Sequence, residues 1–312
     1  MRVFVAGATG AIGTRLVPQL VDRGHEVVGT ARSAERAAPL RGLGAEPVVL
    51  DLLDPPAVRK AILTARPDAI VHQATALAGM SDFKQFDRSF AATNRLRTDG
   101  TDALLAAARE ASVRRVVAQS YAGWPYARVG GAVKTEDDPL DPDPVPAMRE
   151  TLAAIRHLEQ AVADVGGVAL RYGGFYGSPD DAQLELVRKR RFPIVGDGGG
   201  VWSFVHLDDA AAATVLALER GASGVYNVVD DEPAPVREWL PALAEAIGAP
   251  PPRHVPGWLA RLAAGESGVV LMTESRGASN AKAKRELGWA LRYPSWRQGF
   301  VAAYGGAAAA AA

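Results

Sequence analysis

Hydroxyl side chains cluster in the stretch "SYAGWPYAR", residues 120–128. Ser120, Tyr121 and Tyr126 each carry an O–H group that can polarise a reacting oxygen or give it a proton. The stretch follows the apolar run "RRVVAQ", which is typical of a buried strand. Ligands of parallel sheets bind at the carboxyl ends of the strands, so these three residues are the candidate catalytic groups. The alternative for each tyrosine is a ring packed under the loop with its hydroxyl on water.

Glycines near the N-terminus have the spacing of a phosphate-binding turn. The stretch "GATGAIG" places Gly7, Gly10 and Gly13 between the first apolar run and a helical pattern. The first glycine permits a tight turn, the second lets the backbone approach a pyrophosphate, and the third lets helix and strand pack closely. The N–H groups at the start of the helix then face the phosphates. We predict a dinucleotide site here, with a purely structural glycine turn as the alternative.

The end of the second strand pattern, "GTARS", indicates which dinucleotide binds. An NAD site usually has an acidic residue here that holds the ribose 2′-hydroxyl, whereas this chain has Ala31 followed by Arg32. A guanidinium pairs with a 2′-phosphate, so NADP(H) is favoured and NAD(H) is the second choice. The alternative for Arg32 is a solvated surface charge. Asp51, after the third strand pattern, either accepts a hydrogen bond from the adenine amino group or caps the next helix.

Short apolar runs alternate with helical patterns along the chain, and this alternation predicts the fold. The apolar runs are "RVFVAG", "HEVVGTA", "EPVVLD", "AIVHQA", "RRVVAQS", "GVALRY" and "GVYNVV". The helical patterns cover 11–23, 33–43, 55–65, 95–111, 148–165 and 207–220. This order predicts an α/β fold with a doubly wound parallel sheet of the Rossmann type.

The rhythm of strands and helices breaks after residue 172 and again after residue 230. The first break brings a basic run and a glycine cluster, and the second brings Pro-rich stretches. We expect a dinucleotide-binding Rossmann domain from 1–172 plus 201–230. A smaller C-terminal substrate-binding domain is expected from 173–200 plus 231–312.

Composition excludes several classes of function. The 312 residues contain 35 basic and 35 acidic side chains, so we expect neither nucleic acid nor a membrane as a partner. The chain has no cysteine, and its His and Asp residues show no ligand spacing, so no metal site is expected. It shows neither a signal-peptide pattern nor a run of about 18 apolar residues, and we expect a cytoplasmic protein. A small-molecule substrate is the expected partner, and a homodimer is left open.

Seven motifs together resemble an extended short-chain dehydrogenase/reductase of the NAD-dependent epimerase/dehydratase type, over nearly the whole length. The motifs are "GATGAIG", "LDLLDP", "VHQATA", "RRVVAQS", "LRYGGFYG", "WSFVHLDDAA" and "AKRELGW". The resemblance implies that Ser120 lies at the family's catalytic serine or threonine. The expected cofactor-binding residues are Gly7, Thr9, Gly10, Ala11, Ile12, Gly13, Arg32, Asp51, Leu52, Gln73, Ala74, Thr75 and Tyr172.

The chain departs from this family in the helix "AMRETLAAIRHLEQ", residues 147–160. The family carries a Tyr-x-x-x-Lys pair there, and counting back from Glu159 places Thr151 and Ile155 at the two positions. No Tyr-x-x-x-Lys exists anywhere in the sequence. The helix face that carries Thr151 and Ile155 is nearly apolar, so any proton donor must come from another element. An asparagine typical of the family falls on either Asn94 or Arg97, and we leave that choice open.

The expected substrate pocket is apolar. It comprises Trp124, Thr151, Ile155, Phe175 and Trp202. Trp202 stands near the place where the family often has an arginine that binds the diphosphate of a nucleotide sugar. An indole in place of this cation favours a less charged substrate.

Three functions fit these observations. The principal prediction is an NADP-dependent oxidoreductase or epimerase that acts on a small, fairly apolar metabolite. The first alternative is an isomerase, dehydratase or cyclase that keeps the nucleotide bound without a net redox step. The second alternative is a non-enzymatic nucleotide-sensing module that binds a protein partner.

Overall fold

A seven-stranded parallel sheet forms the centre of the larger part of the molecule. The computed structural model describes residues 1–77, 84–178 and 182–309. The strand order is β12-β7-β5-β4-β1-β2-β3, and every neighbouring pair in it is parallel. The strands are β1 (Arg2–Ala6), β2 (Glu26–Ala31), β3 (Ala45–Val49), β4 (Ala69–His72), β5 (Arg115–Tyr121), β7 (Val168–Tyr172) and β12 (Gly224–Val228). The doubly wound α/β fold predicted from the sequence is confirmed.

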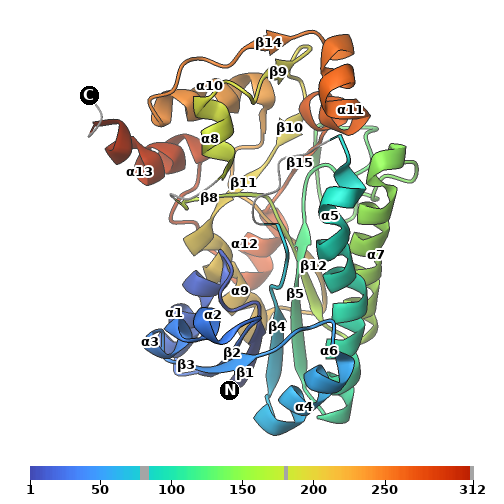
Figure 1. Ribbon diagram of the computed structural model, residues 1–312, viewed down its shortest axis with the longest axis vertical. Helices are drawn as coiled ribbons and strands as arrows, with labels where there is room; N and C mark the ends of the chain where they lie inside the picture. The colour runs from blue at the N-terminus through green and yellow to red at the C-terminus, as the bar shows by residue number, and fades with distance from the viewer. Residues whose placement is uncertain (78–83, 179–181, 310–312) are drawn as a thin grey trace.

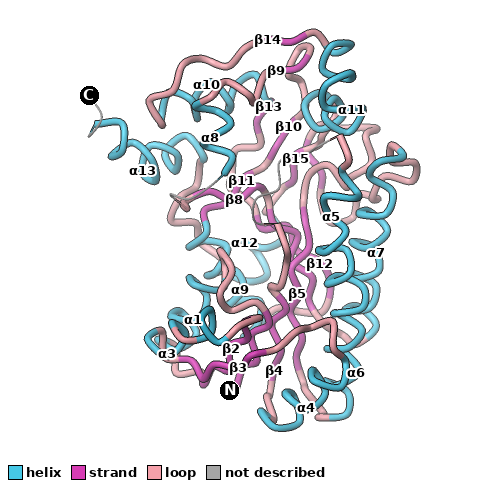
Figure 2. Tube along the Cα trace, viewed as in Figure 1, coloured by secondary structure: helices cyan, strands magenta, loops and turns pink. Residues whose placement is uncertain are grey.

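Helices cover both faces of this sheet (Figures 1 and 2). Val3 and Val5 of β1 share one core with the helices on the first face, and Phe4 and Ala6 share another with those on the second. This split follows from the alternation of side chains along a strand. The first face carries α1 (Gly13–Asp22), α2 (Ala34–Ala37), α3 (Pro39–Gly42) and α9 (Leu207–Arg220). The second carries α4 (Pro55–Ala65), α5 (Phe86–Arg95), α6 (Thr101–Glu110) and α7 (Arg149–Asp164).

One helix of the second face is interrupted. The sequence pattern predicted a helix over 95–111, but the structure begins it at Phe86 as α5, and a π-helical turn, η1 (Leu96–Gly100), joins α5 to α6. Single π turns of this kind are frequent at functional sites. Because a π turn is wider than an α-helical turn, the side chains of residues 96–100 point in directions that differ from those on a continuous α-helix.

A smaller layer of helices and two-stranded sheets lies beyond the carboxyl ends of the strands (Figure 1). Its strands are β8 (Gly174–Tyr176), β9 (Ile194–Val195), β10 (Val201–Trp202), β11 (Phe204–His206), β13 (Ala234–Pro235), β14 (His254–Val255) and β15 (Gly277–Ala278), with β15 pairing to β6 (Val133–Lys134). Its helices are α8 (Ala182–Arg188), α10 (Val236–Ala246), α11 (Gly257–Thr273) and α13 (Trp296–Ala309). They enclose a separate aromatic core around Trp239 and Trp296.

The segment around residues 281–289 packs on a different part of the molecule from the domain to which the sequence assigned it. Helix α12 (Ala281–Leu287) buries Ala283 and Leu287 in the core of the large sheet, together with Trp289. The sequence assigned this segment to the smaller domain because it follows the Pro-rich stretch. Its apolar face packs instead against α9 and β12.

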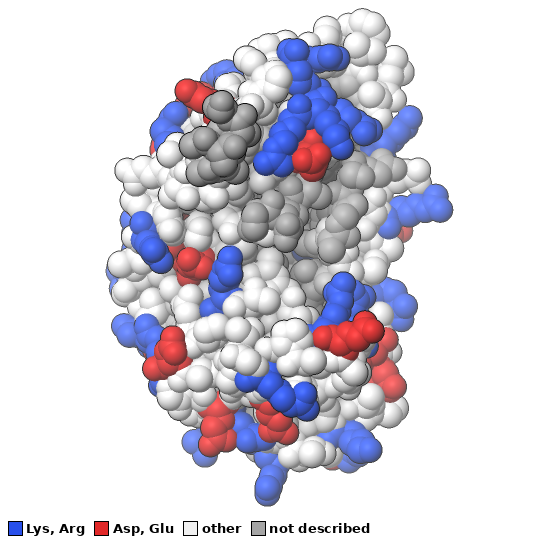
Figure 3. Space-filling model, turned by 60° about the vertical axis from the view of Figure 1, so that its left-hand side comes forward, with Lys and Arg blue, Asp and Glu red and all other residues white. Residues whose placement is uncertain are grey.

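The surface carries mixed charge. On the face shown in Figure 3, acidic and basic side chains lie next to one another over the lower half, and basic side chains gather toward the top. In the basic run at 187–191, Arg188 and Lys189 both pair with Glu185. Within the described ranges, no helix combines the length and apolarity needed to cross a membrane. The same residues hold no group of three or more His, Asp or Glu side chains that could bind a metal ion.

Candidate active site

The glycine turn has the geometry that phosphate binding requires. Gly7 has a φ of +87°, and a Cβ on it would lie 2.7 Å from the backbone nitrogen of Ala74. A Cβ on Gly13 would lie 2.5 Å from the carbonyl oxygen of Gly7, so helix α1 packs directly on the turn. A Cβ on Gly10 would meet only that same oxygen, at 3.3 Å. Gly10 therefore leaves open space in front of the turn, which a pyrophosphate can approach.

The first turn of α1 offers free donors beside this space. Within the described part of the chain, the N–H groups of Ala11 and Ile12 have no backbone acceptor. Ala11 is exposed, Thr9 is half-buried, and Ile12 packs into the core. Unpaired N–H groups at a helix start bind anions, so the residues present fit a dinucleotide.

The adenosine end agrees in part with the sequence-based expectation. Ala31 is buried and Arg32 is exposed, and no ion pair or hydrogen bond of the Arg32 side chain is found among the described residues. Asp51 is exposed and accepts a hydrogen bond from the N–H of Leu53 at 2.9 Å. The cap of α4 is Asp54, which accepts from the N–H of Ala57, so the interpretation of Asp51 as a helix cap is wrong. Leu52 is buried beneath Asp51 in the core.

Two of the expected cofactor contacts face the interior. The Gln73 amide donates to the Tyr172 hydroxyl at 3.0 Å, and that hydroxyl lies 2.7 Å from the hydroxyl of Thr214. Tyr172 has no exposed surface. At this edge, Ala74 and Thr75 are half-buried beside Gly7 and can contact a ligand, whereas Tyr172 fills the core.

On helix α7, the Thr151 hydroxyl is engaged inside the protein. Thr151 is fully buried, and its hydroxyl donates to Asp87 at 2.6 Å and accepts from the Asn94 amide at 3.0 Å. The same carboxylate accepts the N–H groups of Glu150 and Thr151 at the start of the helix. Ile155 is buried in an apolar cluster with Trp124 and others. Thr151 therefore joins α5 to α7 and does not line the cavity described below.

Two of the three candidate hydroxyls are held by a buried ion pair. Arg171 of β7 makes two hydrogen bonds to Glu159 of α7, at 2.7 and 2.6 Å. Ser120 is 1% exposed and donates to the same carboxylate at 2.6 Å. The Tyr126 hydroxyl donates to Asn227 and accepts from Arg171, and its ring is fully buried. Both hydroxyls are thus engaged inside the protein, where burial raises the pKa of Tyr126.

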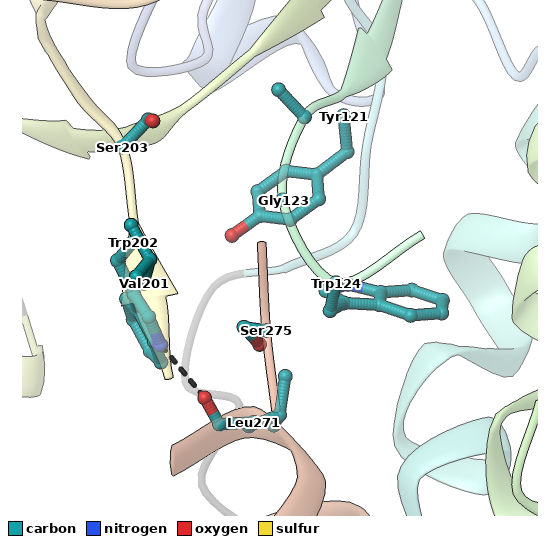
Figure 4. A pocket seen from close by; sticks show the side chains of 9 residues that line it. Tyr121, Gly123, Trp124, Val201, Trp202, Ser203, Leu271 and Ser275 are labelled. Atoms are coloured by element: carbon teal, nitrogen blue, oxygen red, sulfur yellow. Dashed lines mark hydrogen bonds between the residues drawn. The ribbon is translucent and has the colours of Figure 1, made fainter. Parts of the chain in front are cut away.

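Tyr121 is the candidate that faces open space. A small cavity lies between the loop after β5 and the smaller layer, and Tyr121 points its hydroxyl into it (Figure 4). The lining consists of Tyr121, Ala122, Gly123, Trp124, Val201, Trp202, Ser203, Leu271 and Ser275. The Trp202 indole is oriented by a 2.8 Å hydrogen bond to the Leu271 carbonyl (Figure 4). Burial raises the pKa of Tyr121 to about 12, so the phenol is protonated at neutral pH.

Some of the residues that were expected in the substrate pocket line this cavity. Other residues that line it were not expected. Trp124 and Trp202 line it, but Phe175 packs against Tyr172, with ring centroids 5.4 Å apart. Leu271 and Ser275, at the end of α11 and just after it, were not expected. No sequence signal pointed to them, since their place depends on how the smaller layer packs on the sheet.

Arg97, on the turn η1, lies over the ring of Phe90, which packs against the same apolar cluster as Tyr121. Its side chain is 5% exposed and its Nη1 atom has no hydrogen-bond partner among the described residues. Asn94, one turn earlier, is bonded to Thr151. The sequence did point to this part of the chain, because Asn94 and Arg97 were the two candidates for the family's asparagine position.

The fold and the glycine turn define a nicotinamide-nucleotide enzyme of the short-chain dehydrogenase/reductase superfamily, and the comparisons with known proteins agree. The NAD dependent epimerase/dehydratase family matches residues 3–229, and the chain belongs to this family. The solved UDP-glucose 4-epimerase of Thermotoga maritima has a TM-score of 0.77 at 21% identity, with 97% of each chain covered. That of Thermus thermophilus, in complex with NAD, has a TM-score of 0.75 at 26% identity over both full chains.

The relatives of the chain include proteins that are named as reductases. The chain is 45% identical to a 3-diazoavenalumate denitrifying reductase from Streptomyces sp, over 96% of this chain and 99% of that protein. It is 31% identical to the 4-hydroxy-2-methyl-3-oxo-4-farnesyl-3,4-dihydroquinoline-1-oxide ketoreductase of Stigmatella aurantiaca, over 94% and 92%. The protein is therefore an oxidoreductase or epimerase with a nicotinamide cofactor, and the non-enzymatic alternative is not supported.

Proposed function

We propose that the protein is an NADPH-dependent reductase of a small, flat aromatic substrate, in which Tyr121 transfers the proton. The observation that carries this proposal is the cavity at the carboxyl end of β5, lined by Tyr121, Trp124 and Trp202. Among the described residues that line it there is no charged side chain, which suits a largely apolar ring better than a nucleotide diphosphate. The cavity has a volume of about 10 Å³, so binding of an aromatic ring requires the smaller layer to move away from the sheet.

The reaction that we place first is the reductive removal of nitrogen from an aromatic diazo acid, because the relative at 45% identity bears such a name. When bound, NADPH supplies a hydride. Addition of hydride to the terminal nitrogen of Ar–N2⁺ gives Ar–N=N–H. The phenol of Tyr121 then protonates the ring carbon as the C–N bond breaks, and the tyrosinate takes the N–H proton as N2 leaves. The sum is Ar–N2⁺ + NADPH → Ar–H + N2 + NADP⁺.

Carbonyl reduction is the second candidate, since another relative is named a ketoreductase. In that reaction Tyr121 gives its proton to the alkoxide oxygen and regains one from water. Both reactions need the same phenol at the same place, and they differ in the substrate that is consumed.

The test uses purified protein with NADPH and a panel of probes: 4-diazobenzoate, aryl ketones, aryl enones and UDP-glucose. Diazonium ions oxidise NADPH slowly by themselves, so each rate is measured against a protein-free control. We expect consumption of an aromatic probe and none of UDP-glucose. Turnover of UDP-glucose, or conversion of a probe without NADPH consumption, would contradict the proposal.

Isotope labelling distinguishes the routes to the ring carbon. If Tyr121 protonates that carbon, benzoate formed from 4-diazobenzoate in D2O carries ring deuterium, because the phenol exchanges with solvent. If the hydride goes directly to carbon, the label comes only from NADPH deuterated at C4. The second outcome would remove Tyr121 from the denitrification step.

A further inference from the structure

The guanidinium of Arg97 is buried in a way that calls for an explanation. It is 5% exposed, its Nη1 has no partner among the described residues, and no carboxylate there lies within ion-pair distance of it. Burial lowers its pKa to about 10, so it remains a cation at neutral pH. An unpaired buried cation is costly, and such groups are retained mainly where they act.

The groups around Arg97 come from four elements. Phe90 of α5 lies under the guanidinium, 6.0 Å from ring centroid to Cζ. His72 of β4 is neutral, since burial lowers its pKa to about 4, and it bonds the Leu96 carbonyl through Nε2. Glu159 of α7 interacts electrostatically with Arg97, but its two oxygens are already bonded to Arg171. Tyr121 on β5 packs against the same apolar cluster as Phe90, and its phenol interacts electrostatically with Arg97.

We infer that Arg97 is the positioning residue of Tyr121 and supplies the cation that α7 lacks at position 155. The inference rests on the proposed role of Tyr121. On α7 the corresponding place is held by Ile155, inside an apolar cluster. The cation instead comes from the neighbouring turn η1, which directs Arg97 toward β5. Its charge stabilises the tyrosinate that forms whenever Tyr121 gives up its proton.

A titration of Tyr121 tests the inference without any substrate. A fluorinated tyrosine placed at position 121 ionises in a range where the protein is folded, and ¹⁹F NMR follows it. We expect Arg97→Gln to raise the pKa of this phenol by about 1 or more, since a nearby cation favours the charged form of a phenol. Arg97→Lys should keep the pKa near its original value. Arg95→Gln, at the exposed end of the preceding helix α5, is the control. An unchanged pKa in folded Arg97→Gln would overturn the inference.

A double-mutant cycle then asks whether Arg97 acts on turnover through Tyr121. We expect Arg97→Gln to lower kcat by about 10-fold or more, with the KM for NADPH nearly unchanged and with recovery in Arg97→Lys. In a Tyr121→Phe background, Arg97→Gln should cost nothing further. A loss that multiplies in the double variant would show a separate structural role and contradict the inference. If Tyr121→Phe itself is fully active, the proposed function fails, while the titration still decides the coupling.

Discussion

At the scale of single residues, a hydroxyl can serve a substrate only when the protein does not already hold it. Ser120 and Tyr126 are bonded to Glu159, Arg171 and Asn227 inside the sheet. Tyr121 follows Ser120 by one position, yet its hydroxyl faces the cavity. Alternation along β5 therefore separates a hydroxyl that is bonded inside the protein from one that faces the cavity.

Replacement of Ser120 tests this separation. We expect Ser120→Ala to lower the free energy of unfolding by about 1–3 kcal/mol, because the buried Glu159 carboxylate loses a donor. The value of kcat should change little. Chemical denaturation and steady-state kinetics measure the two quantities, and Ser223→Ala, whose hydroxyl bonds a backbone carbonyl, is the control. A loss of about 10²-fold in kcat at unchanged stability would instead make Ser120 a donor to the substrate.

Arg32 carries the expected preference for NADP(H). In Arg32→Ala we expect the affinity for NADPH to fall by about tenfold or more while the affinity for NADH is kept, because a charge-assisted contact to the 2′-phosphate is lost. Calorimetric titration of both cofactors measures this. Arg41→Ala, an exposed arginine on α3, should change neither affinity. Equal affinity of the unaltered protein for NADPH and NADH would refute the preference.

At the scale of elements, α5 and α7 are joined through a polar contact at Thr151, the position that was aligned with the family's tyrosine. Asp87 and Asn94 of α5 both bond the hydroxyl of Thr151 on α7. The contact fixes the position of the start of α7. It thereby also positions Ile155 within its cluster of aromatic and aliphatic side chains.

Thr151→Val should therefore lower the free energy of unfolding without lowering the rate of turnover. We expect a loss of about 1–3 kcal/mol in the free energy of unfolding, because the buried Asn94 amide loses its acceptor. The rate of NADPH consumption should stay nearly the same. Thr64→Val, on the exposed side of α4, should alter neither quantity. A large fall in the rate at unchanged stability would contradict this prediction and indicate that Thr151 has a catalytic role.

The elements also show how far sequence patterns reach. The glycine turn and the buried strands were predictable because their signals are local: fixed glycine spacing and continuous apolar runs. The surroundings of Arg97 were not, since a π turn leaves no pattern in the sequence and its neighbours come from four separate elements. Leu271 and Ser275 were missed for a similar reason, because tertiary packing alone brings α11 to the cavity. The same holds for α12, whose apolar face suits either layer.

At the scale of the whole molecule, Asp230 lies where the large sheet meets the smaller layer. It follows β12, its N–H bonds the Phe204 carbonyl at 2.6 Å, and it is 1% exposed. Burial raises its pKa to about 8, so the folded protein keeps a proton there that the unfolded chain releases near its ordinary pKa of 3.8. Stability should therefore fall as the pH rises from about 4 to about 8.

Asp230→Asn should flatten this part of the pH dependence, because the amide has no proton to lose. Between pH 5 and 8 we expect the free energy of unfolding of the unaltered protein to fall more steeply, by up to about 1.4 kcal/mol per pH unit. Denaturation at several pH values measures the slope. Asp22→Asn, at an exposed position on α1, should leave the slope unchanged. Equal slopes for Asp230→Asn and the unaltered protein would contradict the assignment. Assembly as a homodimer stays a prediction at this scale.

The central claim is that the active phenol is Tyr121 at the carboxyl end of β5, and one measurement tests it most directly. The rate of NADPH consumption by Tyr121→Phe is compared with that of the unaltered protein, on 4-diazobenzoate or whichever aromatic probe the latter consumes fastest. We predict a fall of about 10²-fold or more, with the Kd for NADPH unchanged, because the variant keeps the ring and loses only the transferable proton. A Tyr121→Phe protein that consumes NADPH at the original rate would contradict the account.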